Sequence, residues 1–591
     1  MASSPLTLLG ARLGEAAAKA WGAEVAVPDP LVVPTRDRRH GDYTCAAALA
    51  VARPLGQPPA VLAQRLVDAA DLADVCEAPE VVRPGFVNLR LRPGWLSDRV
   101  AAAIGDESVG VDAAAEPARV VVDYSGPNMA KEMHVGHLRS TILGDCLANV
   151  LELLGHQVER VSHVGDWGTQ FGMLVAHLED VRPQVLSGPG EPGEPDLELG
   201  DLVAFYQAAK VRFDTDRAFG DRARRRVVDL QSGAAGAAAA WRALVGASRR
   251  ENRLVYERLG VEGLVERGES TYQPGLAQVV ADLVAAGLAV VDDGATCVFV
   301  EGFTNAAGEP LPLIVQKADG GYTYATTDLA AVRHRVEAGA DRLVYVVDAG
   351  QSQHLEMVFA VARRAGWLPP GVTATHVAFG LVLGAGGKRL RTRSGQTVRL
   401  RDLLDEAVAR ARAFLDERAA EREEPLPPDA DGVAQVVGIG AVKYADLSQN
   451  RQSNYVFSYD RMLSLKGNTA PYLMYAHARI RSILGEAGAA PGAGPGRVEV
   501  VLHAPQELEL AKRLVEVGDV CQRVAAELAP NHLCAYLYDL SQAYNQFYEH
   551  CPVLQAGEPD LRASRLALCQ VTAATLRRGL ALLGIGAPAR I

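Results

Sequence analysis

The stretch from Ala118 to Gly155 constrains the fold of this chain more than any other part of the sequence. It begins with a short run of β-branched residues, passes through Gly126-Pro127-Asn128, which is typical of a turn, and then carries apolar residues at helical spacing from Leu138 to Leu154. Gly155 is a suitable helix end. We therefore predict a buried strand, a tight loop and a long helix.

Two histidines, His134 and His137, stand at the expected start of this helix. A helix N-terminus presents free N–H groups and the positive end of the helix dipole, so it attracts phosphate. The two imidazoles would share one face and hold phosphate oxygens in a transition state, where one such donor is worth ~3–4 kcal/mol. Gly136 would let a flat base approach the backbone, and Lys131 adds a point charge. On these residues alone two alternatives stay open, which are polar surface and a zinc site that lacks a third ligand nearby.

The residues around the two histidines carry a longer and far more specific pattern. It resembles the ATP-binding signature of class I aminoacyl-tRNA synthetases, and its first part resembles the arginine-specific family in particular. The pattern consists of Pro127, Asn128, Met129, Ala130, Lys131, Glu132, Met133, His134, Val135, Gly136 and His137. The resemblance implies that His134, His137 and Lys131 are catalytic and that Gly136 and the two histidines bind ATP.

Composition limits the partners and the compartment. The chain has 591 residues, of which 49% are hydrophobic, enough for roughly three or four domains. Its net charge of −11 argues against broad nucleic-acid binding, so we expect a tRNA grip confined to local basic patches. No apolar run is long enough for a membrane span, and the first residues lack a signal-peptide pattern. The eight cysteines include no Cys-x-x-Cys pair, so we expect a cytoplasmic protein without a structural metal.

The resemblance covers nearly the whole chain and implies an α/β fold class. The parts would be a Rossmann-like nucleotide-binding core with an insertion, a small α+β N-terminal domain and a helical C-terminal anticodon-binding domain. We place the N-terminal, tRNA-contacting domain at residues 1–112, the catalytic domain at 113–400 and the anticodon-binding domain at 401–591.

The insertion is expected at about residues 181–295, where the pattern is largely helical and charged. We interpret the arginines around Arg224 as a solvated helix face, with contact to RNA phosphates as the alternative. The core is expected to resume near Thr296, with strands at 297–300 and 313–316.

The run from His163 to Gly172 follows the next expected strand, at 158–162. A strand, a helix and a strand of these lengths predict a parallel βαβ unit, and open α/β sheets bind ligands at the carboxyl ends of their strands. We therefore interpret the run as a candidate binding loop, with a tight turn that needs glycines as the alternative. It also resembles the second signature of the arginine family.

Asp328 stands at the start of a further expected helix. Its carboxylate could accept two parallel N–H bonds from a guanidinium, a pairing that a lysine ammonium cannot reproduce. The alternative is a helix cap made by Thr327 or Asp328. The resemblance implies a pocket for arginine in which Asp123 and Asn128 hold the α-amino group; the residues it assigns to arginine binding are Asp123, Asn128, Tyr324, Asp328 and Gln351.

A basic, glycine-rich loop at Gly384–Gly395 occupies the place of the mobile Lys-Met-Ser-Lys-Ser loop of class I synthetases, but the second lysine is absent. The resemblance assigns Lys388 and Arg391 to ATP binding. Lys131 is expected to supply the missing ammonium, a theme of the arginine family, and a basic surface hairpin is the alternative for the loop.

Aromatic residues are frequent in the C-terminal part. Tyr472 and Tyr475 match positions that face the anticodon loop in the family, so the resemblance assigns them to tRNA binding. We expect most of the others, such as Tyr536, Tyr544 and Phe547, to belong to the core.

The resemblance implies an enzyme that ligates L-arginine to tRNA(Arg), uses ATP with Mg²⁺, and passes through an arginyl-adenylate, and we expect a monomer. The resemblance further implies that arginine activation requires bound tRNA. Three alternatives remain, which are a different nucleotidyl transferase, an inactive RNA-binding paralogue, and a synthetase for another amino acid.

Overall fold

The computed structural model describes residues 4–28, 31–35, 37–129, 131–183, 202–305, 307–384, 386–390, 398–423, 425–488 and 499–591. The chain divides into two compact units. The first comprises Met1–Ala115, Ser464–Leu582 and Gly586–Ile591, and the second comprises Glu116–Leu463 and Leu583–Ile585. Within the described ranges, no helix has the length and apolar character needed to cross a bilayer.

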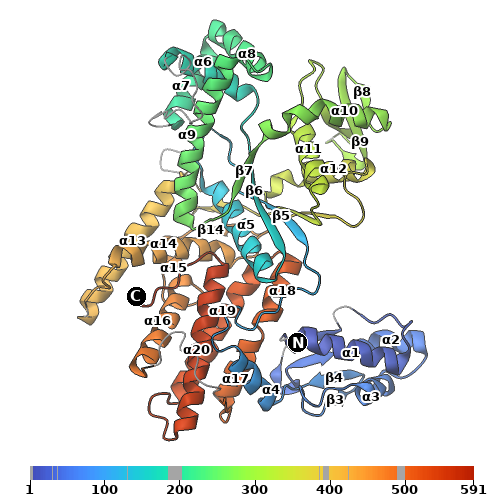
Figure 1. Cartoon of the computed structure of the whole chain (residues 1–591), viewed down its shortest axis with the longest axis vertical. Helices are drawn as coiled ribbons and strands as arrows, with labels where there is room; N and C mark the ends of the chain where they lie inside the picture. Colours follow the sequence, from blue (N-terminus) through green and yellow to red (C-terminus); the bar gives the residue numbers. More distant parts are fainter. Residues whose placement is uncertain are drawn as a thin grey trace. The chain divides into compact units, whose positions relative to one another are not determined.

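The core of the second unit is a five-stranded parallel sheet, which confirms the predicted α/β class (Figure 1). Its strands, in spatial order, are β12 (Thr373–His376), β11 (Arg342–Tyr345), β5 (Arg119–Asp123), β6 (Gln157–Val164) and β7 (Val265–Gly268). The chain winds outward from β5 through β6 and β7, then returns to the other side with β11 and β12. The winding therefore reverses between β5 and β11, where Asp123 is level with Tyr345.

The predicted strand, loop and helix are confirmed as β5, the segment that follows it, and α5 (Val135–Leu153). The other elements differ from the sequence prediction in their partners. The strands expected at 297–300 and 313–316 exist, but they form a separate antiparallel sheet of β8 (Val290–Asp292), β9 (Ala295–Thr304) and β10 (Pro310–Gln316). In turn, β7 lies inside the range expected for the insertion. It nevertheless belongs to the core sheet, because it pairs with β6, where Val164 lies opposite Gly268.

Four helices follow the β6 strand and pack on one another (Figure 1, teal to green). They are α6 (Thr169–Val181), α7 (Leu202–Thr215), α8 (Arg217–Gln231) and α9 (Ala235–Leu259). Arginines of α8 form ion pairs with carboxylates of α6, as Arg226 does with Glu179 at 2.7 Å and Arg222 does with Asp180. These ion pairs stabilise the packing of the helices, and contact with RNA phosphates stays the alternative to a solvated helix face.

The remaining elements of this unit complete the layers around the sheet. They are η3 (Glu269–Gly275), α10 (Leu276–Ala285), α11 (Tyr324–Glu337), η4 (Ala349–Gln351), α12 (Ser352–Arg364), β13 (Val382–Leu383), α13 (Leu400–Arg422), α14 (Ala430–Leu447), β14 (Tyr455–Val456) and α15 (Tyr459–Met462). The sequence prediction had grouped α13 to α15 with the C-terminal helices. The structure instead packs α13 and α14 on α5, where the buried Arg139 of α5 pairs with the buried Asp446 of α14 at 3.0 Å.

The first unit contains a small α+β domain. Its antiparallel sheet has the order β1 (Val32–Pro34), β2 (Tyr43–Cys45), β4 (Phe86–Leu89) and β3 (Glu80–Val82). Its helices are α1 (Pro5–Trp21), η1 (Arg38–His40), α2 (Ala47–Leu55), α3 (Pro59–Ala69) and α4 (Pro93–Ala102).

The same unit contains the C-terminal helices α16 (Ala470–Glu486), α17 (Pro505–Val515), α18 (Val517–Glu527), α19 (Asn531–His550) and α20 (Pro559–Leu582). Tyr536, Tyr544 and Phe547 are buried there, which confirms that these aromatic residues belong to the core.

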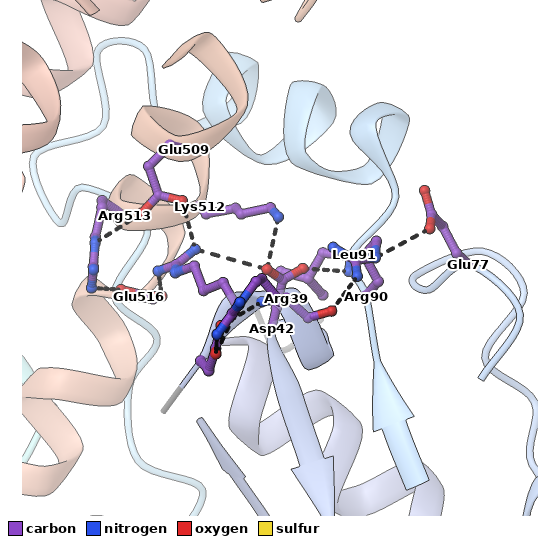
Figure 2. A network of polar contacts seen from close by, with 11 residues as sticks. Arg39, Asp42, Glu77, Arg90, Leu91, Glu509, Lys512, Arg513 and Glu516 are labelled. Atoms are coloured by element: carbon purple, nitrogen blue, oxygen red, sulfur yellow. Dashed lines mark hydrogen bonds and ion pairs between the residues drawn. The ribbon is translucent and has the colours of Figure 1, made fainter. Parts of the chain in front are cut away.

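A network of charged side chains joins the small domain to α17 (Figure 2). The carboxylate of Asp42 is almost fully buried; it lies 2.7 Å from Nζ of Lys512 and accepts the N–H of Leu91 at 2.9 Å. Arg38 binds Glu509 and Glu516 at 3.2 and 2.8 Å. Each of these three carboxylates thus has a cation within reach, which the burial of Asp42 requires.

Candidate active site

A cavity of about 840 Å³ opens at the carboxyl ends of β5 and β11, where the winding of the sheet reverses. Open α/β sheets bind their ligands at this position. The cavity gathers eight residues that the sequence predicted for the site, namely Asp123, Asn128, His134, Gly136, His137, Tyr324, Asp328 and Gln351. We therefore take it as the candidate active site.

The two histidines form the N-terminal cap of α5. Nδ1 of His134 accepts the N–H of Gly136 at 3.0 Å, and Nδ1 of His137 accepts the N–H of His134 at 3.0 Å. The two rings stack with their centroids 4.0 Å apart. Because both Nδ1 atoms are acceptors, the neutral rings carry their protons on Nε2. Each histidine therefore offers one Nε2–H donor beyond the cap.

Both histidines are held neutral. Loss of hydration on burial lowers the pKa of His134, and it lowers the pKa of His137 to about 3, with further contributions from His134 and Lys131. His137 consequently stays uncharged throughout the neutral pH range and acts as a hydrogen-bond donor with no net charge. The positive charge near the helix start comes from the helix dipole and from Lys131.

The loop between β5 and α5 is shaped by contact with the second glycine-rich run. The N–H of Met129 donates to the carbonyl oxygen of Gly165 at 3.0 Å. A Cβ atom on Gly165 would lie 2.4 Å from Oδ1 of Asn128, so only glycine leaves room for this carboxamide. The prediction that the run is a binding loop thus has a physical basis, since Gly165 lets Asn128 line the cavity.

Asp123 lines the cavity, and a buried arginine holds its carboxylate in place. Its Oδ2 accepts a hydrogen bond from Nη2 of Arg335 on α11 at 2.7 Å, and both side chains are buried. The guanidinium also lies over the ring of Tyr345 at 5.1 Å. The ion pair between the buried carboxylate and the buried guanidinium compensates part of the hydration that both groups lose.

The far end of the cavity is acidic and aromatic. Asp328 has Oδ2 at 2.6 Å from Nε2 of His354, and the ring of His354 meets the ring of Tyr324 edge-on with centroids 4.9 Å apart. The idea that Asp328 caps the helix is wrong, because α11 already begins at Tyr324 with Thr323 as its N-cap. A cap of this kind is made by Asp348, whose carboxylate accepts the N–H of Gly350 at 2.9 Å at the start of η4.

Glu269, which the sequence analysis did not select, also lines the cavity. Burial and the negative charges of Asp328 and Asp166 raise its pKa to about 7. A carboxyl group with a raised pKa in a cleft is a typical functional group. The available signal was an acidic residue directly after the short strand β7, which lies within a stretch that otherwise reads as helical.

Other predicted site residues lie elsewhere. Among the described residues that line the cavity, Arg389 and Leu390 represent the basic loop, whereas Lys388 and Lys131 are not part of the lining. Nζ of Lys131 lies 5.0 Å from the ring centroid of Tyr206. Arg391 and Ala130 fall outside the described residues.

Tyr472 and Tyr475 are half-buried on α16 of the other unit. The hydroxyl of Tyr472 accepts hydrogen bonds from Gln542 at 2.9 Å and Asn545 at 2.7 Å, and its ring lies 5.6 Å from that of Tyr538. These contacts hold one aromatic side chain in a fixed position among polar groups. Its role in tRNA binding stays a prediction.

Comparisons with known proteins agree along the whole chain. Three family models match: "tRNA synthetases class I (R), catalytic domain" over residues 99–459, "DALR anticodon binding domain" over 473–591, and "Arginyl tRNA synthetase N terminal domain" over 8–91. An arginine–tRNA ligase of Synechococcus elongatus is 54% identical over 585 residues and covers 99% of both chains. One from Thermosynechococcus vestitus is 52% identical over 98% of this chain and 99% of its own.

Solved structures are similar over the same length. The arginyl-tRNA synthetase of Plasmodium falciparum superposes with a TM-score of 0.83 at 27% identity and covers 99% of each chain. That of Thermus thermophilus gives a TM-score of 0.78 at 25% identity, covering 99% of this chain and all of its own.

Proposed function

The chain belongs to the arginine-specific family of class I aminoacyl-tRNA synthetases, and from this premise we propose how its cavity performs the reaction of that family. The reaction is the ATP-dependent ligation of L-arginine to tRNA(Arg). It proceeds through an arginyl-adenylate and releases pyrophosphate and AMP.

The end of the cavity formed by the start of α5 binds ATP in this proposal. His134 and His137 place two Nε2–H donors at a helix N-terminus, which is an arrangement suited to phosphate oxygens. Gly136 leaves its backbone open to the adenine ring. Lys131, Lys388 and Arg391 supply positive charge from the flanking loops, and we expect them to approach the phosphates only when ATP is bound.

ATP is expected to enter with Mg²⁺, which suits phosphate oxygens and retains several water ligands. Among the described residues, no group of three or more His, Cys, Asp or Glu side chains could hold a metal ion. In this proposal the ion binds to phosphate oxygens of ATP, and its charge offsets theirs.

The opposite end binds arginine, and the observation that carries this assignment is the acidic pair Asp328 and Glu269 in one cavity. A guanidinium presents N–H groups in a planar fork and matches carboxylates better than an ammonium does. Tyr324 and Gln351 flank this end. Asp123 and Asn128 lie at the other end of the substrate, where they can accept hydrogen bonds from its α-ammonium group.

The reaction depends on the positioning of the two substrates and on compensation of the charge that develops on the phosphate oxygens. An oxygen of the arginine carboxylate attacks the α-phosphorus of ATP, and the bond from that phosphorus to the bridging oxygen of pyrophosphate breaks. A hydroxyl of the terminal tRNA ribose then attacks the carbonyl carbon of the adenylate, and AMP leaves. His134 and His137 stabilise the charge that develops on the phosphate oxygens in the first step.

The proposal is tested by ATP–pyrophosphate exchange with each of the twenty amino acids, with and without total tRNA. We expect exchange with arginine alone and only when tRNA is present. Exchange with arginine in the absence of tRNA would keep the substrate and remove the tRNA requirement. Exchange with another amino acid would contradict the assignment of the acidic pair, and no exchange at all would favour an inactive RNA-binding protein.

The acidic pair also predicts how arginine binding depends on pH. The pKa of Glu269 is raised to about 7, and only its ionised form pairs with a guanidinium. Below pH 7 the carboxyl group is increasingly protonated, so the KM for arginine should rise by about tenfold per pH unit and level off above pH 7. Steady-state kinetics between pH 5.5 and 8.5 measure this, with the KM for ATP as the internal reference.

A Glu269→Gln variant should raise the KM for arginine at and above pH 7, where Glu269 of the unmodified enzyme is ionised, and should lose the acid limb. A KM for arginine that does not change between pH 6 and 8 in the unmodified enzyme would contradict the role of Glu269.

We further propose a monomeric enzyme in the cytoplasm. All eight cysteines are buried thiols that form no disulfide, which suits a reducing compartment. Tyr472 and Tyr475 would stack on bases of the anticodon loop, a contact worth ~1–3 kcal/mol per base. Sedimentation at working concentration tests the oligomeric state.

A further inference from the structure

Asp166 is a buried acidic residue that the reaction itself does not explain. It follows β6 in the second glycine-rich run, and its side chain is fully buried. Its carboxylate accepts two hydrogen bonds from one residue, Ser270, from the backbone N–H at 2.9 Å and from Oγ at 2.7 Å. Ser270 directly follows Glu269. The carboxylate of Asp166 thus holds the backbone next to Glu269, one of the two acidic residues proposed to bind the guanidinium.

Two neighbouring residues, Gly268 and Trp241, fix Asp166 in the position that it needs for these hydrogen bonds. A Cβ atom on Gly268 would lie 1.9 Å from Oδ2 of Asp166, so the last position of β7 has room only for glycine. From the other side, Nε1 of Trp241 donates to the carbonyl oxygen of Asp166 at 2.7 Å. The position of Asp166 is therefore fixed from both directions.

The first turn of η3 depends on this contact. Its N-cap residue is Gly268, which has no side chain and so provides no capping hydrogen bond. The bond from Ser270 to Asp166 ties down a free N–H of the first turn, a task that a cap residue normally performs. Because the backbone of Ser270 is held, the Cα atom of Glu269 is held as well.

We propose that Asp166 is a positioning residue, which acts through Ser270 to keep the carboxylate of Glu269 inside the arginine-binding cavity next to Asp328. This inference rests on the proposed function. Glu269 needs such a tether because two carboxylates, Asp328 and Asp166, repel it and the cavity removes part of its hydration. An untethered side chain would lower its energy by turning toward solvent and would leave Asp328 alone with the substrate.

The other titratable groups near Asp166 and Glu269 have contacts of their own. Asp328 on α11 is paired with His354 of α12. Asp166 is influenced by the positive charge of Arg249 on α9, which also lies 3.2 Å from Glu266 of β7. His163 at the end of β6 stacks on Tyr272 of η3 with centroids 5.5 Å apart.

A double-mutant cycle tests the tether directly. Ser270→Ala removes the Oγ bond and keeps the backbone bond, and we expect the KM for arginine to rise about 5–20-fold with the KM for ATP unchanged. In a Glu269→Gln background the same change should have little further effect, because the carboxylate it positions is gone. Thr271→Ala, which removes the exposed hydroxyl of the next residue, is the matched control and should leave both constants unchanged.

The pH profile provides a second readout, which reports how close the carboxylates of Asp166 and Glu269 lie and does not depend on the stability of the fold. Asp166→Asn keeps the size of the side chain but removes a negative charge that raises the pKa of Glu269. The acid limb of kcat/KM for arginine should therefore shift to lower pH in this variant. It should stay in place in the Thr271→Ala control.

Two outcomes would overturn the inference: an unchanged KM for arginine in Ser270→Ala, or an equal rise in the presence and absence of the Glu269 carboxylate. A fall in thermal stability and a rise in the KM for ATP with no selective effect on arginine would show a merely structural role. These failures are distinct from failure of the proposed function, which would appear as a lack of arginine-dependent exchange in the unmodified enzyme.

Discussion

Replacing His137 by alanine is expected to lower the rate of arginine activation by about 10²–10³, which corresponds to ~3–4 kcal/mol of lost transition-state stabilisation. The reason is that, in the proposed mechanism, Nε2–H of His137 donates to phosphate oxygens whose charge increases as the α-phosphorus is attacked. The neutral ring costs little to bring near the substrate, because its pKa is lowered to about 3 and it carries no charge to be solvated. Single-turnover formation of the adenylate in the presence of tRNA measures the effect.

The controls for this variant follow from the second role of the ring. Nδ1 of His137 also accepts the N–H of His134, so the alanine variant loses part of a helix cap. His137→Gln places an acceptor at the same helix position and should restore stability more than rate. His156→Ala is the matched control, since Nδ1 of His156 accepts the N–H of Ala118 at 3.1 Å, far from the cavity. Equal losses of tRNA affinity and activation rate in His137→Ala would indicate misfolding and contradict the catalytic role.

The parts of the site that depend on local sequence could be predicted. The strand, loop and helix around His134 are encoded by a change of apolar spacing within one short stretch, and the family pattern lies on it. These features depend on neighbours in the chain, so periodicity and turn residues are sufficient signals. The place of Asp328 in the pocket was predicted from the resemblance of its stretch to the family's amino-acid pocket, whereas the helix start expected at Thr327 or Asp328 lies at Tyr324.

The parts of the site that depend on contacts between distant segments could not be predicted from the sequence. Glu269 enters the cavity because β7 pairs with β6, and β7 is a short strand within a range expected as an insertion. The pairing of Asp123 with Arg335 requires the packing of α11 against the sheet. The strands at 297–300 and 313–316 were found, but alternation along a strand does not identify its partner, and they form a sheet of their own.

The second large effect is expected at the acidic end of the cavity, where Asp328→Asn should raise the KM for arginine by about 10²–10³. Removal of one member of a desolvated, hydrogen-bonded charge pair costs ~2–5 kcal/mol, much of it because the remaining guanidinium is buried without its counter-charge. Asparagine retains the size of the side chain and one acceptor oxygen, so the cavity should keep its shape. The KM for ATP should stay unchanged, since Asp328 lies at the end of the cavity away from α5.

Selectivity gives the sharpest measure of this change. Citrulline carries a neutral urea group in place of the guanidinium, and the unmodified pocket should reject it because two carboxylates would be left without a cation. With Asp328→Asn the ratio of kcat/KM for arginine over citrulline should fall, since the arginine term decreases more than the citrulline term. Asp319→Asn is the matched control, because this exposed aspartate binds only the N–H of Gly321 among the contacts found for its side chain in the described structure. If Asp328→Asn left the KM for arginine and this ratio unchanged, Asp328 would be only the partner of His354, and Glu269 would have to bind the guanidinium alone.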